Sequence, residues 1–172
     1  MSISLVEFIQ KKLGYPVLQK VDPVDHEVKG ESGQSLSEKL GQAAIPAVLA
    51  AFYKFTRSEK GGKNILSAEG QENWLNIILE NKVGSALDKV IHYAGVTVRE
   101  AEAAMKDIAA EAVQAIRESV NRQPTYEAVK KYMSDQRRAI LVYLPAAMQM
   151  GSLLEDNLPG GRTDMKESLT PS

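Results

Sequence analysis

Cysteine is absent from this sequence of 172 residues. Its absence excludes disulfide scaffolds, iron–sulfur clusters, thiolate zinc sites and catalysis by a thiol. A chain of this length buries roughly 70% of its unfolded surface on folding, so it needs neither a disulfide nor a metal for stability. No cofactor is therefore required by composition.

Long hydrophobic runs are also scarce. The two most apolar runs, Ala43–Phe52 and Ile140–Met150, have about ten residues each, half of what a bilayer span needs. The N-terminal segment Met1–Gly14 lacks the order of regions that a secretory signal peptide has. We therefore interpret both runs as buried core helices and predict a cytoplasmic protein with no transmembrane segment.

Neither sign of charge is in excess. The chain has 21 basic and 22 acidic residues and a formal net charge of −1, whereas nucleic-acid binders usually carry a basic excess or a basic face. Glu127 and Asp135 interrupt the best candidate set for nucleic-acid contact, and Glu127 is spaced to pair with Lys131 on one helix face. We predict a solvated surface and no nucleic-acid partner. The candidate set consists of Lys130, Lys131, Arg137 and Arg138, interleaved with Tyr126, Tyr132 and Tyr143.

Most of the recognisable local patterns in the sequence are those that begin or end helices. A glutamate lies three residues after each of Ser4, Ser35 and Thr97, which is the spacing of a capping box. Gly14 and Gly95 are placed to end helices in the left-handed conformation. No segment shows sustained alternation of polar and apolar residues. These patterns predict an all-α, single-domain bundle of about six helices.

The predicted order of elements follows from these signals and from the prolines and glycines. Pro46 predicts a kink or break near Ala44–Ile45, because proline removes a backbone donor and clashes with the preceding turn. The expected elements are a helix over 3–13, an extended connector over 14–34, a helical core over 35–156 and a flexible tail over 157–172. Within the core we expect a helix from Ser35 ended by Gly61 and Gly62, one capped by Ser67 that carries Trp74, one capped by Ser85, one over Thr97–Val120, and one over 125–156 bent at Pro145.

The helix over Thr97–Val120 has the clearest apolar stripe, spaced by threes and fours. Met105, Ile108, Ala112 and Ile116 form its predicted packing seam. Such a seam can pack inside the bundle or pair with a second chain. We favour internal packing because other apolar helices are available in the same chain.

One acidic cluster contains a histidine. Asp22, Asp25 and His26, with Glu27 beside them, offer oxygen and imidazole ligands that suit a divalent cation or acid–base chemistry. The spacing matches no calcium loop and no second histidine is near, so a solvated loop with a turn at Asp22 is favoured. We predict no metal and no enzymatic activity, and retain these residues as the weak candidates for either.

Three other features have ordinary structural interpretations. The glycine-rich segment 59–64 lacks the hydroxyl residue, the first glycine and the preceding strand of a phosphate-binding loop, and is interpreted as a flexible turn between helices. His92 lies near a helix end, where it can interact with the last carbonyl groups. Trp74 is expected to fill the core or an interface.

Segments Leu13–Pro23, Gln42–Leu49 and Leu144–Met148 carry a family resemblance. With its Ile-Pro-Ala and Leu-Pro-Ala helix segments, the chain resembles a group of all-helical bacterial proteins and is distantly similar to the YidB-like domain of unknown function. The resemblance implies a bacterial origin and the all-α class. It implies no activity.

Two functions remain open at this point. The first is a non-enzymatic protein that acts by self-association or by binding a protein partner, indicated by slim, alanine-rich helix surfaces. The alternative is a small-molecule or lipid-binding module, if helices bent at Pro46 and Pro145 enclose an apolar gap.

Overall fold

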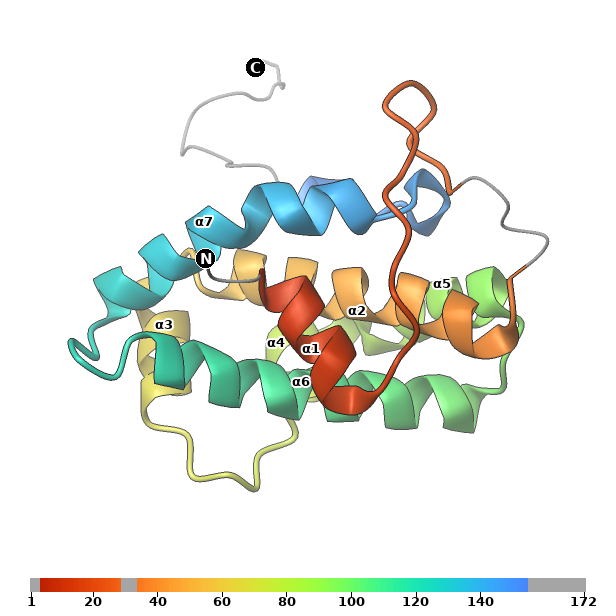
Figure 1. Cartoon of the computed structure of the whole chain (residues 1–172). Helices are drawn as coiled ribbons and strands as arrows, with labels where there is room; N and C mark the ends of the chain where they lie inside the picture. The colour runs from red at the N-terminus through yellow and green to blue at the C-terminus, as the bar shows by residue number, and fades with distance from the viewer. Residues whose placement is uncertain (1–3, 29–33, 155–172) are drawn as a thin grey trace, which may run out of the picture.

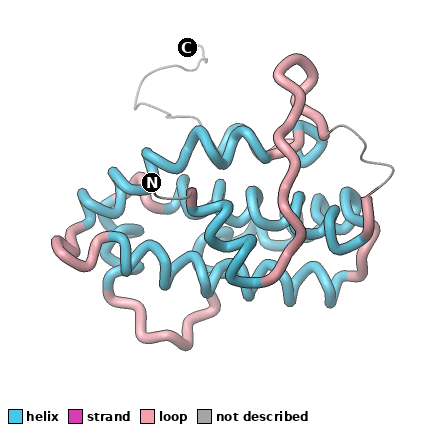
Figure 2. Tube along the Cα trace, in the orientation of Figure 1, coloured by secondary structure: helices cyan, strands magenta, loops and turns pink. Residues whose placement is uncertain are grey.

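The computed structural model describes residues 4–28 and 34–154, and every regular element in these ranges is helical. No strand occurs in them, which confirms the predicted all-α bundle; the predicted tail over 157–172 lies outside the described residues. Figures 1 and 2 show α2 running through the middle, between α7 and α6. The elements are α1 (Leu5–Leu13), α2 (Leu36–Phe55), α3 (Glu59–Leu66), α4 (Trp74–Leu79), α5 (Val83–Ala94), α6 (Val98–Ser119) and α7 (Tyr126–Tyr143), with 3-10 turns at Glu80–Lys82, Ala146–Met148 and Gly151–Leu154.

Local capping chemistry begins and ends helices as predicted. The side chains of Ser4, Ser35 and Thr97 each accept the amide N–H of the glutamate three residues later, and that glutamate accepts the amide N–H of the cap residue. Gly14 and Gly95 end α1 and α5 with φ values of 78° and 71°. Glycine adopts this left-handed conformation without the steric penalty of a Cβ atom.

Helix α2 is the centre of the hydrophobic core. Every residue from Gly41 to Tyr53 is buried, so this helix has no solvent-facing side over that length. A helix that is apolar on all sides must be covered on all sides. α1, α4, α5, α6 and α7 all contact it, and the buried side chains of these helices form one cluster.

The expected break at Pro46 does not occur. Helix α2 runs from Leu36 to Phe55 with Pro46 inside it. Proline removes one intrahelical hydrogen bond, but Pro46 lies within the buried stretch, where surrounding helices hold the turns on both sides in place. The break predicted at this proline is therefore wrong, whereas the alternative of a kink stays a prediction.

Gly61 and Gly62 do not form a turn; they lie inside α3, where they are buried. A Cβ atom on Gly61 would overlap the carbonyl oxygen of Phe55, and one on Gly62 would lie 2.9 Å from the Cβ of Tyr126. The glycines therefore permit close approach of α3 to the end of α2 and to α7. The two glycines thus serve the packing of helices against one another. Their low helix propensity is the reason that the sequence predicts a turn here instead.

We expect Gly61→Ala to destabilise the protein by about 1–3 kcal/mol, because the atom that the new methyl group would meet belongs to the backbone and cannot rotate away. Gly84 supplies the matched control, since it is an exposed glycine in α5 and a Cβ atom there would meet nothing within 4 Å. Gly84→Ala is expected to stabilise the protein by up to about 1 kcal/mol through helix propensity. Chemical denaturation measures the free energy of unfolding of both variants, and the two changes should have opposite signs. Equal changes would contradict the close approach of α3 to the end of α2.

Helices α4 and α5 begin at residues other than those predicted. Ser67 does not cap the helix that carries Trp74, because α3 extends to Leu66 and Ser67 ends it. α4 instead begins after Asn73, whose side chain is the cap. Ser85 caps nothing either, since α5 follows a 3-10 turn directly and already includes it. The start of α4 is therefore capped by a different residue from the one predicted, and α5 starts without a side-chain cap.

The last helix is shorter than the predicted span of 125–156. α7 ends at Tyr143, and Leu144 adopts an extended conformation before Pro145. The proline ring disfavours helical geometry at the preceding residue, so the chain leaves the helix instead of bending within it. Short 3-10 turns follow, and residues 155–156 lie outside the described range.

The connector is held against the bundle by a buried side chain. Gln42 of α2 is 1% exposed; its Oε1 accepts the N–H of Gln19 at 2.8 Å, and its Nε2 donates to the carbonyl groups of Gln19 at 3.0 Å and Tyr143 at 2.7 Å. The N–H of Val21 also donates to the carbonyl of Val142 at 2.8 Å. The described part of the connector, 14–28, is therefore extended, as predicted, and firmly attached.

Among the described residues, no helix combines the length and the apolar character that crossing a bilayer requires. The division into a helical domain over 1–156 and a tail stays a prediction.

Candidate functional site

The predicted packing seam lies inside the chain. Met105, Ile108, Ala112 and Ile116 of α6 are each 0% exposed. They face the core, where α6 packs against α2, α1 and α5. Side chains buried within one chain are not accessible to a second chain, so of the two alternatives the structure favours internal packing.

The acidic cluster forms a turn with a structural use for its carboxylates. Oδ1 of Asp22 accepts the N–H groups of Val24 at 2.7 Å and Asp25 at 3.3 Å, and Oδ1 of Asp25 accepts that of Glu27 at 3.0 Å. Backbone bonds from Asp22 to Glu27 and from His26 to Asp22 close the turn. The predicted loop with a turn at Asp22 is confirmed, and the described residues contain no cluster of three or more potential metal ligands.

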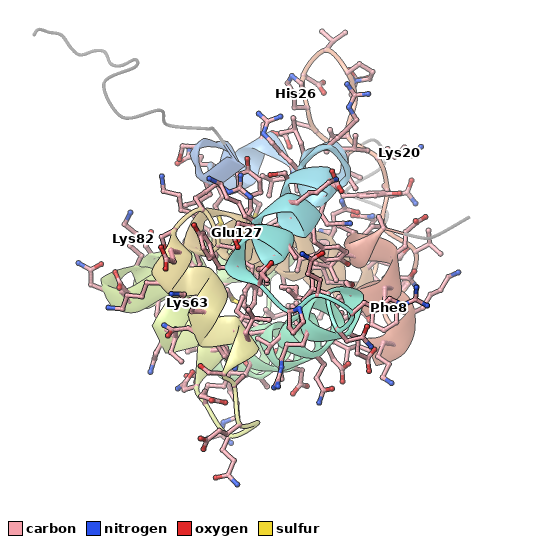
Figure 3. The ribbon with its side chains drawn as sticks, turned by 90° about the vertical axis from the view of Figure 1, so that its left-hand side faces the viewer. Phe8, Lys20, His26, Lys63, Lys82 and Glu127 are labelled. Carbon is pink, nitrogen blue, oxygen red and sulfur yellow. The ribbon has the colours of Figure 1, made fainter. Side chains whose placement is uncertain are left out.

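This turn projects from the molecule. In Figures 1 and 2 it extends beyond the helices, and Figure 3 labels His26 on it. Its base is attached by the carbonyl of His26, which accepts the N–H of Ala146 at 2.8 Å. The tip presents an aliphatic side chain, because Val24 is 89% exposed. We call residues 22–27 the projecting turn.

Two of the basic and aromatic residues of α7, Lys131 and Tyr132, are already engaged within the chain. Lys131 pairs with Asp135 at 3.2 Å and not with Glu127 as predicted; the two carboxylates lie four residues from the lysine, one on either side of it in the sequence. Burial raises the pKa of Tyr132, whose ring is half-buried and cannot stack freely on a base. A salt bridge at the same helical spacing joins Glu102 and Lys106 of α6 at 3.4 Å.

Trp74 lies in the core as predicted, whereas His92 contacts a carbonyl one turn before the last carbonyl groups of its helix. Nδ1 of His92, in the last turn of α5, lies 2.8 Å from the carbonyl oxygen of Asp88. Trp74 is 6% exposed and packs against the rings of Phe52 and Phe55, each with its centroid 6.2 Å away. His92 also borders an open surface cleft of about 630 Å³ between α5 and Gln149.

A second surface cleft, of about 570 Å³, lies between the loop over 67–73 and the C-terminal half of α6. In Figure 1 this loop lies below α6, on the side opposite the projecting turn. Apolar side chains and polar side chains both line the cleft. The apolar ones include Trp74, Leu66 and Val113, and the polar ones include Glu69, Glu72, Gln114, Arg117 and Glu118.

Two interactions shape this cleft. Nη1 of Arg117 donates to the carbonyl of Ala68 at 2.6 Å and joins α6 to the loop. The carboxylate of Glu72 accepts the N–H groups of Glu69 at 2.7 Å and Gly70 at 3.0 Å. These hydrogen bonds, that from Glu69 foremost, hold the pKa of Glu72 below its ordinary value of 4.5. A carboxylate is stabilised in its charged form by donors of this kind.

Glu72 is expected to make stability depend on pH. Because its pKa is lowered in the folded state, its contribution is fully present above the ordinary value of 4.5 and is lost as the pH falls through the folded value. Glu72→Gln should therefore lower the denaturation midpoint at neutral pH but not at a pH well below that range. Glu111→Gln is the control on the neighbouring helix. If Glu72→Gln lowered the denaturation midpoint by the same amount in acid as at neutral pH, the charge of Glu72 would not be the source of its contribution.

Sequence reasoning missed both surface features. The cleft brings together residues that are distant in sequence, and the sequence pattern assigns the segment from Ser67 onward to a helix. The exposed Val24 lies within the recognised connector, but its exposure is set by hydrogen bonds of the turn. The one available signal is the density of glutamate and glycine in segment 69–72.

Comparison with protein-family models, with curated proteins and with solved structures finds no match to this chain. The resemblance to the YidB-like domain therefore stays a prediction.

Proposed function

We propose that this is a non-enzymatic protein that binds a protein partner through the projecting turn, residues 22–27. The observation that carries the proposal is the 89% exposure of Val24 at the tip of a turn whose backbone is held by Asp22. A single exposed aliphatic residue is ordinary on a flat surface. Here it stands on a segment that extends away from the helices (Figure 2).

The hydrogen bonds of the turn favour recognition by a partner. Binding normally requires loops to become ordered, and this lowers affinity. Asp22 and Asp25 already order the turn in the free protein, and the His26 carbonyl attaches its base to the bundle. The same bonds support a non-enzymatic role, because they engage the carboxylates that are the candidates for acid–base chemistry.

The experiment replaces Val24 by a photo-crosslinking amino acid in cells of the source organism and identifies the adduct by mass spectrometry. Val17 is the matched control, since it is 75% exposed on the same connector but lies outside the turn. One defined partner that is captured at position 24, is not captured at position 17 and is lost from Val24→Asp in a binding assay would support the proposal. Equal capture at both positions would contradict it.

Self-association is tested with the purified chain. Native mass spectrometry at two concentrations is expected to give a monomer if the partner is a different protein. A dimer that disappears in Val24→Asp and remains in Val17→Asp would identify a second copy as the partner. The predicted cytoplasmic location is retained as part of this proposal.

A second candidate function is supported by the 570 Å³ cleft beside Trp74. Small-molecule pockets commonly have volumes of about 300–1,000 Å³ and combine apolar walls with a few polar groups. Neither Pro46 nor Pro145, the prolines at which an apolar gap is considered from the sequence, lines this cleft. A bound molecule that survives purification and appears as added mass in the native spectrum would support this candidate, and protein without added mass would count against it.

A further inference from the structure

We infer that the cleft between loop 67–73 and α6 binds a small organic cation, with the carboxylates of Glu69 and Glu118 as its counter-charges. This inference specifies the second candidate function and does not depend on the projecting turn. It rests on the charge of the lining, on the hydrogen bonds that the other charged groups of the cleft already make, and on the apolar residues in the lining.

The charge of the lining is negative. Three carboxylates, those of Glu69, Glu72 and Glu118, face one guanidinium group, that of Arg117, which leaves a formal charge of −2. The protein as a whole is almost neutral, with a formal charge of −1. A concave surface of one sign concentrates ions of the opposite sign. The cleft therefore attracts cations more strongly than the average surface does.

The charged groups of the cleft differ in what they already bind. Glu72 accepts backbone N–H groups of its own loop, and Arg117 donates to the carbonyl of Ala68. Within the described part of the chain, the carboxylates of Glu69 and Glu118 make no hydrogen bond or ion pair. These two groups are thus the ones available to an incoming ammonium group, which has three donors to offer.

The apolar residues that line the cleft account for the organic part of the ligand. Trp74, Leu66 and Val113 are among these lining residues. An inorganic cation would leave their apolar surface in contact with water, whereas an alkyl or aryl group would cover it. Covering apolar surface favours binding because it removes that surface from water. The volume of 570 Å³ suits a small molecule better than a polypeptide segment.

Trp74 makes the inference directly measurable, because it is the chain's only tryptophan and lines the cleft. The wild-type protein is titrated with phenethylammonium chloride while tryptophan emission and heat are recorded. Phenethyl alcohol, which has the same ring and chain without the charge, is the control ligand. We expect the cation to change the emission and to bind at least about fivefold more tightly than the alcohol, with affinity falling as salt is added.

The matched variants are Glu69→Gln/Glu118→Gln and Glu111→Gln/Glu127→Gln, which remove the same charge inside and outside the cleft. The first is expected to weaken cation binding by about fivefold to twentyfold and the second by less than about twofold. Equal affinity for the alcohol, unchanged affinity in the first double variant, or the absence of both heat and an emission change would each overturn the inference. A native-spectrum adduct that is not cationic would also overturn it while leaving the second candidate function in place.

Discussion

Met105→Asp combined with Ile108→Asp is expected to unfold the protein. Both side chains are 0% exposed and lie on the face of α6 that packs against α2. Each aspartate would be buried without a partner or would expose the core to water, a mechanism that commonly costs about 4 kcal/mol or more. Two such losses exceed the stability of most domains, which is about 5–15 kcal/mol. Far-UV circular dichroism and the loss of a cooperative thermal transition are the measurements.

The matched control adds the same two charges to the exposed side of the same helix. Ala103 and Ala110 are exposed in α6, so Ala103→Asp/Ala110→Asp should remain folded and lose only helix propensity. A Met105→Asp/Ile108→Asp variant that stayed a folded monomer would show that the seam is not part of the internal core. It would thereby reopen the alternative of a seam between chains.

Gln42→Leu is expected to destabilise the protein by about 3 kcal/mol. Gln42 is 1% exposed and makes hydrogen bonds to both backbone groups of Gln19 and to the carbonyl of Tyr143. Leucine has a similar size but leaves these three groups without their partner, and each buried group left so costs about 1–3 kcal/mol. Gln19 is an exposed residue, so water can recover part of the loss.

Gln42→Leu should loosen the connector before it unfolds the whole protein. Because Gln42 joins the connector to α2 and α7, amide hydrogen exchange is expected to rise first at Gln19 and Val21. Gln114→Leu, at an exposed position of α6, is the control and should leave both exchange and stability nearly unchanged. Unchanged exchange at Gln19 in Gln42→Leu would show that the connector is held by other contacts.

Helix boundaries are predictable wherever one local interaction sets them. Ser4, Ser35 and Thr97 begin helices because a cap and its glutamate are only three residues apart and satisfy each other within one turn. Predictions of helix boundaries fail where contacts with segments distant in sequence determine the local structure. A glycine is needed at position 61 because a Cβ atom there would overlap the carbonyl oxygen of Phe55, and Pro46 stays within a helix that other helices cover.

The candidate sites are less predictable than the fold. Asp22, Asp25 and His26 are recognisable as one cluster, but the use of the two carboxylates is clear only from the amide groups that they accept. Glu69 and Glu118 give no signal in the sequence, because they meet only where the loop over 67–73 lies against α6. Side chains distant in sequence form a site only after the backbone has placed them.

By itself the sequence determined the helical class, most helix starts and the apolar stripe of α6, because these depend on residues within four positions of one another. The tertiary structure decided that α2 is the helix covered on every side, that the seam at Met105 and Ile108 faces inward, and that Val24 faces solvent. The reason is physical. Periodicity shows that a helix has an apolar face, whereas the surface that covers this face comes from segments far along the chain, and only their packing determines what remains exposed to a partner or a ligand.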